Sequence, residues 1–152
     1  MSRAARAITI TTLLCLVTRA ADANGIATYI EPQAGAPAQV IGCNASLQYV
    51  NSGFGTEFYR LNMYAQFKNT SSKAAVAVLI RFQLENAFGD VLDNRVGQTS
   101  GTFAPDVEID GNKWSDTDIW AGLGAVRCSV SRVLFQDGST WRDYAAPSPT
   151  SS

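Results

Sequence analysis

The chain has 152 residues, of which 46% are hydrophobic, and its 12 basic and 13 acidic side chains nearly cancel to a net charge of −1. This balance argues against a nucleic-acid-binding protein, because such proteins carry clustered lysines and arginines. The chain contains no histidine, so it lacks the side chain that most often acts as general base in catalysis and as a ligand of zinc.

Residues 1–23 are typical of a cleaved secretory signal peptide. Arg3 and Arg6 precede an uncharged run from Ala7 to Val17, and Ala21-Asp22-Ala23 has the small-x-small pattern that signal peptidase cuts. The run of 11 residues is shorter than the roughly 20 needed to cross a bilayer. We therefore expect cleavage after Ala23 and a secreted protein, or one of the periplasm or cell envelope.

Two alternatives to cleavage of this segment stay open. Cys15 lies inside the apolar run and suggests a lipoprotein, although Leu14 stands before it where a lipobox has a small residue. Arg19 is an unusual charge so close to the cleavage site, which leaves room for a retained anchor. Cleavage would leave 129 residues with a net charge of −3, enough for one domain with one core.

The exported part divides into three segments by composition. Residues 24–38 are rich in Ala, Gly and Pro and predict an extended leader or a poorly ordered linker. Residues 39–144 are expected to form one domain. Residues 145–152 are small and polar with two prolines, and predict a disordered tail.

Alternation of apolar and polar residues predicts strands in the first half of the domain. The apolar-rich segment Val40–Val50 is followed by the turn-forming residues Asn51–Gly55. The segments Glu57–Lys68 and Val76–Glu85 alternate clearly and are separated by the polar Asn69–Lys73. We expect these two strands to pair as a long hairpin with a shared apolar face.

Further strands are predicted in the second half. They are Val91–Val96, a strand through residues 107–109, and Ala125–Gln136. Asp137-Gly138 favours a type I′ hairpin turn, so Ser139–Tyr144 should pair back on the preceding strand. No segment shows sustained helical periodicity. About seven short strands predict an all-β, antiparallel sandwich.

The exported part keeps two cysteines, Cys43 and Cys128, which are 85 positions apart. An oxidising compartment makes a disulfide between them the expected state, with two buried free thiols as the alternative. A catalytic cysteine is disfavoured, because no histidine is present to generate its thiolate.

Three segments resemble a known family of domains. These are Phe67-Lys-Asn-Thr-Ser71 at the end of a strand, Val78–Leu92 with its Phe-Gly-Asp corner, and Gly101-Thr-Phe-Ala-Pro105. Together they are similar to FxLYD-type immunoglobulin-like domains of secreted bacterial proteins, over about a third of the chain. Asp106 stands where that family has the glycine of a Pro-Gly pair. The resemblance implies an immunoglobulin-like β-sandwich without catalytic residues.

An acidic run offers a weak candidate metal site. Asp106, Glu108 and Asp110 alternate before Gly111, as carboxylates do in calcium loops. Thr117 occupies the place of the bidentate Glu that would close such a site. The alternative is a strand whose acids face water while the two residues between them face the core. We expect folding to need no metal.

Aromatic residues offer a candidate binding site. Trp114 and Trp120 lie in the polar, glycine-containing segment Gly111–Gly124, which predicts a surface loop that contacts a protein or a glycan. Packing beneath that loop is the alternative. The other large aromatics considered are Trp141, Tyr59, Tyr64 and Tyr144.

Signatures of catalysis are missing from the sequence. It has no Gly-x-Ser-x-Gly elbow, no Ser-x-x-Lys and no zinc ligand set. Only Lys68, Lys73, Lys113 or a carboxylate could serve as a base, and a paired-carboxylate glycosidase stays open. We expect a non-catalytic binding or interaction module without cofactor, nucleic acid or stable membrane insertion. The alternative is a small carbohydrate-active enzyme or a carbohydrate-binding accessory domain.

Overall fold

The computed structural model describes residues 20–21, 26–51, 53, 57–117, 119 and 122–144. The predicted tail 145–152, Trp120 and most of the predicted signal peptide lie outside the described residues. The described part is all-β and contains no helix, and accordingly none of its segments is a helix that could span a membrane.

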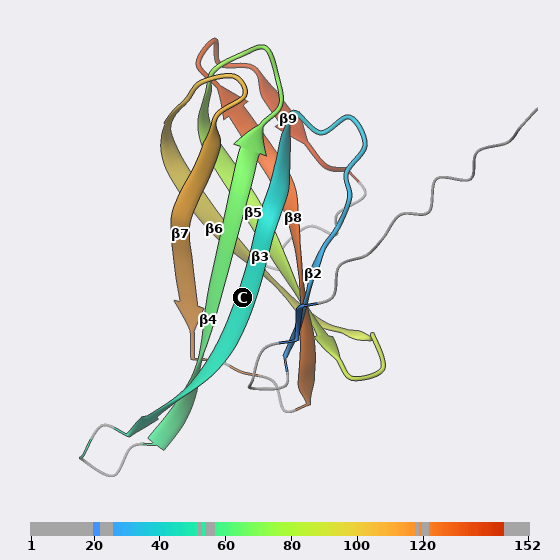
Figure 1. Ribbon diagram of the computed structural model, residues 1–152, viewed down its shortest axis with the longest axis vertical. Helices are drawn as coiled ribbons and strands as arrows, with labels where there is room; N and C mark the ends of the chain where they lie inside the picture. The colour runs from blue at the N-terminus through green and yellow to red at the C-terminus, as the bar shows by residue number, and fades with distance from the viewer. Residues whose placement is uncertain are drawn as a thin grey trace, which may run out of the picture.

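The strands form two sheets that face each other (Figure 1). The larger sheet has the order β1-β2-β8-β5-β6, with β9 also paired to β8, and the smaller sheet has the order β3-β4-β7. The strands are β1 (Ala20–Ala21), β2 (Ala27–Ile30), β3 (Ala38–Asn51), β4 (Glu57–Asn69), β5 (Ala75–Asn86), β6 (Val91–Phe103), β7 (Glu108–Asp116), β8 (Leu123–Phe135) and β9 (Thr140–Arg142).

The core lies between the two sheets. Every second residue of the central strands turns inward, as the period of two in a strand requires. The fully buried side chains include Leu61 and Phe67 of β4, Ile80 and Phe82 of β5, and Val126 of β8. Each sheet therefore buries one apolar face against the other.

A disulfide joins the two sheets. The Sγ atoms of Cys43 in β3 and Cys128 in β8 are 2.03 Å apart, and their Cα atoms are 6.0 Å apart. The predicted pairing of these cysteines is confirmed. Since β3 and β8 belong to different sheets, the covalent bond crosses the core.

The predicted hairpin between Glu57–Lys68 and Val76–Glu85 is wrong. Both segments are strands, but β4 pairs with β3 and β7, whereas β5 pairs with β6 and β8. The connection between them crosses from one sheet to the other. Their two apolar faces consequently meet across the core and do not form one continuous surface.

Asn69 fixes this crossing. Its side chain is fully buried, and its Nδ2 donates to the carbonyl oxygens of Lys73 at 2.8 Å, Phe103 at 2.9 Å and Ala104 at 3.3 Å. Its Oδ1 accepts from the Ser71 amide at 3.1 Å and the Ser71 hydroxyl at 2.7 Å. One side chain thus satisfies buried backbone groups where the chain leaves the ladder.

The segment expected as a leader or linker, residues 24–38, is part of the fold where it is described. Ile26 is buried in the core, and β2 pairs in parallel with β8 from Ala27↔Ala125 to Ile30↔Cys128. The Ala, Gly and Pro content predicts an extended leader or a poorly ordered linker. Residues 27–30 are extended and pair with the edge of β8, next to the buried Ile26.

A glutamine side chain continues the ladder on the edge of β8. Beyond β2, the Gln33 Nε2 donates to the Val130 carbonyl at 2.7 Å, and the Val130 amide donates to the Gln33 Oε1 at 2.6 Å. Further along, the Asp143 amide donates to the Ser131 carbonyl at 3.0 Å, and β9 pairs with residues 132–134. The edge of β8 is therefore occupied along most of its length.

The turn between β8 and β9 differs from the predicted type I′ turn. Gly138 has a φ of 81°, but Asp137 has no positive φ, and a type I′ turn needs both. The Gly138 amide donates to the Phe135 carbonyl at 3.0 Å, as in three-residue loops that end in a left-handed glycine. The expected pairing of the following strand is confirmed over Thr140–Arg142.

Candidate functional site

Trp114 lies in the strand β7, where the sequence predicted a loop. The register shift between Ala65↔Asn112 and Phe67↔Ile109 shows that β7 bulges at residues 110–111, and Gly111 has a φ of 81°. Gly111, which suggested irregular structure, is part of this bulge. After the bulge, β7 continues as a regular strand to Asp116. Trp120, the other predicted contact residue, lies outside the described residues.

The half-buried Trp114 side chain packs between the sheets. Its ring centroid is 5.2 Å from that of Phe82, and a Cβ atom at Gly97 of β6 would come within 2.3 Å of the indole. The indole therefore rests on the glycine backbone. This geometry favours packing, which was the alternative to a contact residue.

The acidic residues of the weak metal candidate do not converge. Asp106 precedes β7 with a φ of 61°, the left-handed conformation that glycine favours, and lies 3.8 Å from the Lys68 Nζ. Glu108 stands opposite Lys68 in the register, and the Asp110 Oδ1 accepts from the Gly111 amide. Among the described residues, no three acids or cysteines are grouped as metal ligands would be.

The remaining predicted aromatics are scattered. Tyr59 is 56% exposed and contacts Tyr49 edge to face, with ring centroids 5.5 Å apart, on the β3–β4 hairpin. Figure 1 shows this hairpin projecting beyond the other strands. Trp141 packs against the core, and Tyr144 is 91% exposed. They do not form one platform.

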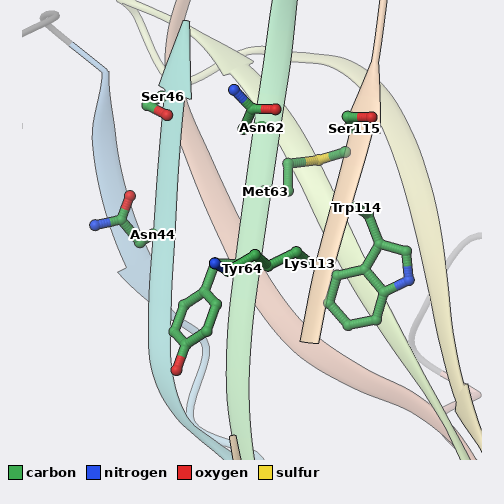
Figure 2. Close-up of a pocket in the computed structure, with 8 residues that line it drawn as sticks. All are labelled: Asn44, Ser46, Asn62, Met63, Tyr64, Lys113, Trp114 and Ser115. Carbon is green, nitrogen blue, oxygen red and sulfur yellow. The ribbon is translucent and has the colours of Figure 1, made fainter. Parts of the chain in front are cut away.

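A groove of about 550 Å³ lies on the smaller sheet. This volume is within the range of small-ligand sites. Figure 2 shows its side chains on β3, β4 and β7. Of its lining residues, Met63 and Trp114 belong to inward-facing positions. The lining residues are Asn44, Ser46, Asn62, Met63, Tyr64, Lys113, Trp114 and Ser115.

The outward-facing lining residues form two rows across three strands. The rows arise because the outward positions of β3, β4 and β7 are aligned by the strand register, with β4 at the centre. Neighbouring strands are about 4.8 Å apart, so each row spans about 10 Å. One row consists of Asn44, Tyr64 and Lys113, and the other of Ser46, Asn62 and Ser115.

Most of these side chains have unused hydrogen-bonding capacity. Among contacts with other described residues, the Asn62 Nδ2 donates weakly to the Gln48 Oε1 at 3.4 Å. The other five outward-facing lining residues make no side-chain hydrogen bond or ion pair within the described part of the chain. The groove thus offers amides, hydroxyls, one phenol and one ammonium group to a ligand, and none of its described lining residues carries a carboxylate.

Sequence reasoning named Tyr64 and Lys113 as candidate functional residues, but it gave them separate roles. Tyr64 was one of several aromatics, and Lys113 one of three possible bases. Their proximity follows from the pairing of β4 with β7. Alternation of apolar and polar residues places Asn62 and Tyr64 on the same face of their strand. It does not indicate which strands lie beside that strand.

No family model matches the chain, and no curated protein matches it. A hypothetical protein from Peptoclostridium difficile 630, known from a 1.85 Å X-ray structure, is similar with a TM-score of 0.43 and 13% sequence identity; the match covers 72% of this chain and 87% of that one.

Proposed function

We propose that the protein is an exported, non-catalytic binding module with an immunoglobulin-like β-sandwich fold, and that its ligand occupies the groove on β3, β4 and β7. The observation that carries this proposal is the gathering of uncommitted polar side chains on one sheet face. Such groups do not lower the stability of the free protein, because water forms hydrogen bonds with them. A ligand can replace this water and make the same hydrogen bonds.

The strand order supports an immunoglobulin-like arrangement. If β3, β4 and β7 correspond to strands A, B and E, then β6, β5, β8 and β9 correspond to C′, C, F and G, a division found among immunoglobulin-like sandwiches. One difference concerns the disulfide: antibody domains link strands B and F, whereas Cys43 and Cys128 would link A and F.

Two observations support export. The segment 1–23 has the pattern of a signal peptide, and the Cys43–Cys128 disulfide is of the kind that persists in oxidising compartments. N-terminal sequencing of the exported protein should begin at Asn24. A start at Met1, or lipid on Cys15, would contradict export as a free protein.

The carbohydrate-binding accessory domain stays a second candidate, because the groove is rich in amides and hydroxyls. An enzyme is less well supported, since glycosidases use a pair of carboxylates and the described residues that line the groove include none. In either case we expect binding without turnover at this site.

The proposal can be tested by retention experiments. The exported protein is immobilised, exposed to a cell-envelope fraction, and the retained protein and sugar are measured. We expect retention by the wild type, loss in the variant Asn62→Ala/Tyr64→Ala/Lys113→Ala, and no change in Arg132→Ala, which alters an exposed residue of the other sheet. Retention independent of the groove, or release of new reducing ends, would contradict the proposal.

A further inference from the structure

We infer that the groove recognises an acidic saccharide, a sugar chain that carries carboxylates; this inference rests on the proposed function. It follows from three features of the face formed by β3, β4 and β7: the recognition must use side chains, these side chains suit a sugar, and the charge among them is positive.

Recognition on the face of β4 must use side chains, because the backbone of this central strand is already paired on both sides. The central strand β4 is hydrogen-bonded to β3 on one side and β7 on the other. A peptide that adds to a sheet as a further strand needs a free edge, and the groove lies on the face. Its ligand is therefore expected to be rich in polar groups of its own.

The side chains suit a polyhydroxylated ligand. Asn44 and Asn62 each offer a donor and an acceptor, and Ser46 and Ser115 offer hydroxyls that do both. Tyr64 lies between the two flanking strands, and its ring provides an apolar face with a polar edge. The two rows cover an area of about 10 Å by 7 Å, which suits a short stretch of saccharide.

The charge of the groove is positive. Lys113 is exposed and is the charged residue among those that line it, and Figure 2 shows its side chain lying across β4 toward Tyr64. Arg60 lies on the same face of β4, two positions before Asn62 in the chain. The chain as a whole carries a net charge of −1. A local cationic face on an anionic protein favours a ligand with carboxylates.

The acids of β7 lie outside this groove. Glu108 is at the other end of the strand, where it stands opposite Lys68 in the register, and Asp110 lies in the bulge beside Gly111. The third acid, Asp116, is paired with Arg95 of β6. The cation of the groove therefore keeps its charge available. A ligand carboxylate is the natural partner of the Lys113 ammonium, while sugar hydroxyls bond to the amides and hydroxyls around it.

The test is calorimetric titration of the exported protein with oligogalacturonate, a carboxylated sugar chain. Its fully methyl-esterified form provides a neutral control with the same sugar backbone, and polyglutamate provides carboxylates without sugar. We expect saturable binding of oligogalacturonate. The methyl ester should bind about tenfold or more less tightly, because it cannot make the charge-assisted hydrogen bond to the Lys113 ammonium. Polyglutamate should also bind about tenfold or more less tightly, because it lacks the sugar hydroxyls and the contact with the Tyr64 ring.

Variants assign the binding to the groove. Lys113→Gln and Tyr64→Ala should each weaken oligogalacturonate binding about tenfold or more, whereas Tyr64→Phe should retain most of it because the ring remains. Arg132→Gln removes one positive charge from the other sheet and should leave binding unchanged. Thermal melts identify any variant that has lost its fold. If Tyr64→Ala is such a variant, the binding affinity of Tyr64→Phe shows whether the aromatic ring without its hydroxyl is enough for binding.

Each other result overturns the inference. Equal binding of the methyl ester would exclude a role for the carboxylates, and equal binding of polyglutamate would exclude a role for the sugar. If none of the three probes binds while retention of envelope material still depends on the groove, the ligand class is wrong and the proposed function stands. If retention does not depend on the groove, the proposed function itself fails.

Discussion

Gly97 and Trp114 form a tightly fitted contact on the open side between the two sheets. The indole rests where any other residue at position 97 would place its Cβ, within 2.3 Å of ring atoms. Polar pairs lie on both sides of this contact: Arg95 with Asp116, and Thr99 with Asn112 at 2.7 Å. The contact closes the core where β6 and β7 face each other.

We predict that Gly97→Ala lowers the free energy of unfolding by about 1–3 kcal/mol, because the added methyl group overpacks the contact. In a Trp114→Leu background, Gly97→Ala should lower the free energy of unfolding much less, because the smaller leucine leaves space for the added methyl group. Urea denaturation of the two single variants and the double variant measures this coupling. Additive effects would show that the indole does not rest on Gly97.

The role of Trp114 was hard to predict from sequence for a local reason. Gly111 and the polar residues around it indicated a loop, but the bulge at residues 110–111 restores the alternation and turns Trp114 inward. A single left-handed glycine can mark a loop or a bulge within a strand. The sequence does not distinguish these two cases, and Trp114 consequently seemed more exposed than it is.

At the scale of elements, Lys73 and Asp137 link two turns at one end of the molecule. The Lys73 Nζ lies 2.7 Å from the Asp137 Oδ2, and the Asp137 Oδ1 accepts from the Ser139 hydroxyl and amide. The Lys73 ammonium, followed by these Ser139 donors, holds the pKa of Asp137 well below its ordinary value of 3.8. The ionised carboxylate therefore fixes the turn between β8 and β9.

We predict that Lys73→Gln raises the pKa of Asp137 toward its ordinary value, as observed by NMR titration of the carboxyl carbon. Because the pKa is depressed in the folded protein, the stabilisation is present above the unfolded pKa and is lost as pH falls through the folded pKa. In the variant, stability should thus depend less on pH below about 4. Lys113→Gln is the matched control, and an equal shift of Asp137 in that control would contradict the assignment.

Strands were easier to predict than their partners. The alternation in Glu57–Lys68 and Val76–Glu85 correctly indicated β4 and β5, because each strand buries one face. The same pattern arises whether two strands lie side by side or face each other across a core. The deciding feature is the Asn69 side chain, which bonds the carbonyls of residues 103 and 104 from far along the chain, and such contacts are not visible in a local pattern.

At the scale of the whole molecule, the disulfide joins the two sheets over a sequence separation of 85 residues. The predicted pairing followed from the expected oxidising compartment and the number of cysteines, not from geometry. Closing so long a loop restricts the unfolded chain strongly in the chain-entropy model. Cys128 is 0% exposed and Cys43 is partly buried, so both halves of the bond pack against the core.

We predict that the variant Cys43→Ala/Cys128→Ala loses about 4 kcal/mol of unfolding free energy. Denaturant unfolding of the variant and of the wild type checks this value. The wild type measured after full reduction serves as the control and should unfold at a similarly low denaturant concentration. If the variant were as stable as the oxidised wild type, the bond would contribute little beyond joining the sheets.

The Gln33 side chain has a consequence for the protein in a crowded environment. An unpaired strand edge recruits a strand of another molecule, which leads to polymerisation. Between the segments of β8 that pair with β2 and β9, the Gln33 amide bonds to both backbone groups of Val130. Neighbouring copies therefore meet an edge of β8 that is occupied along most of its length, which disfavours assembly along this strand even at high protein concentration.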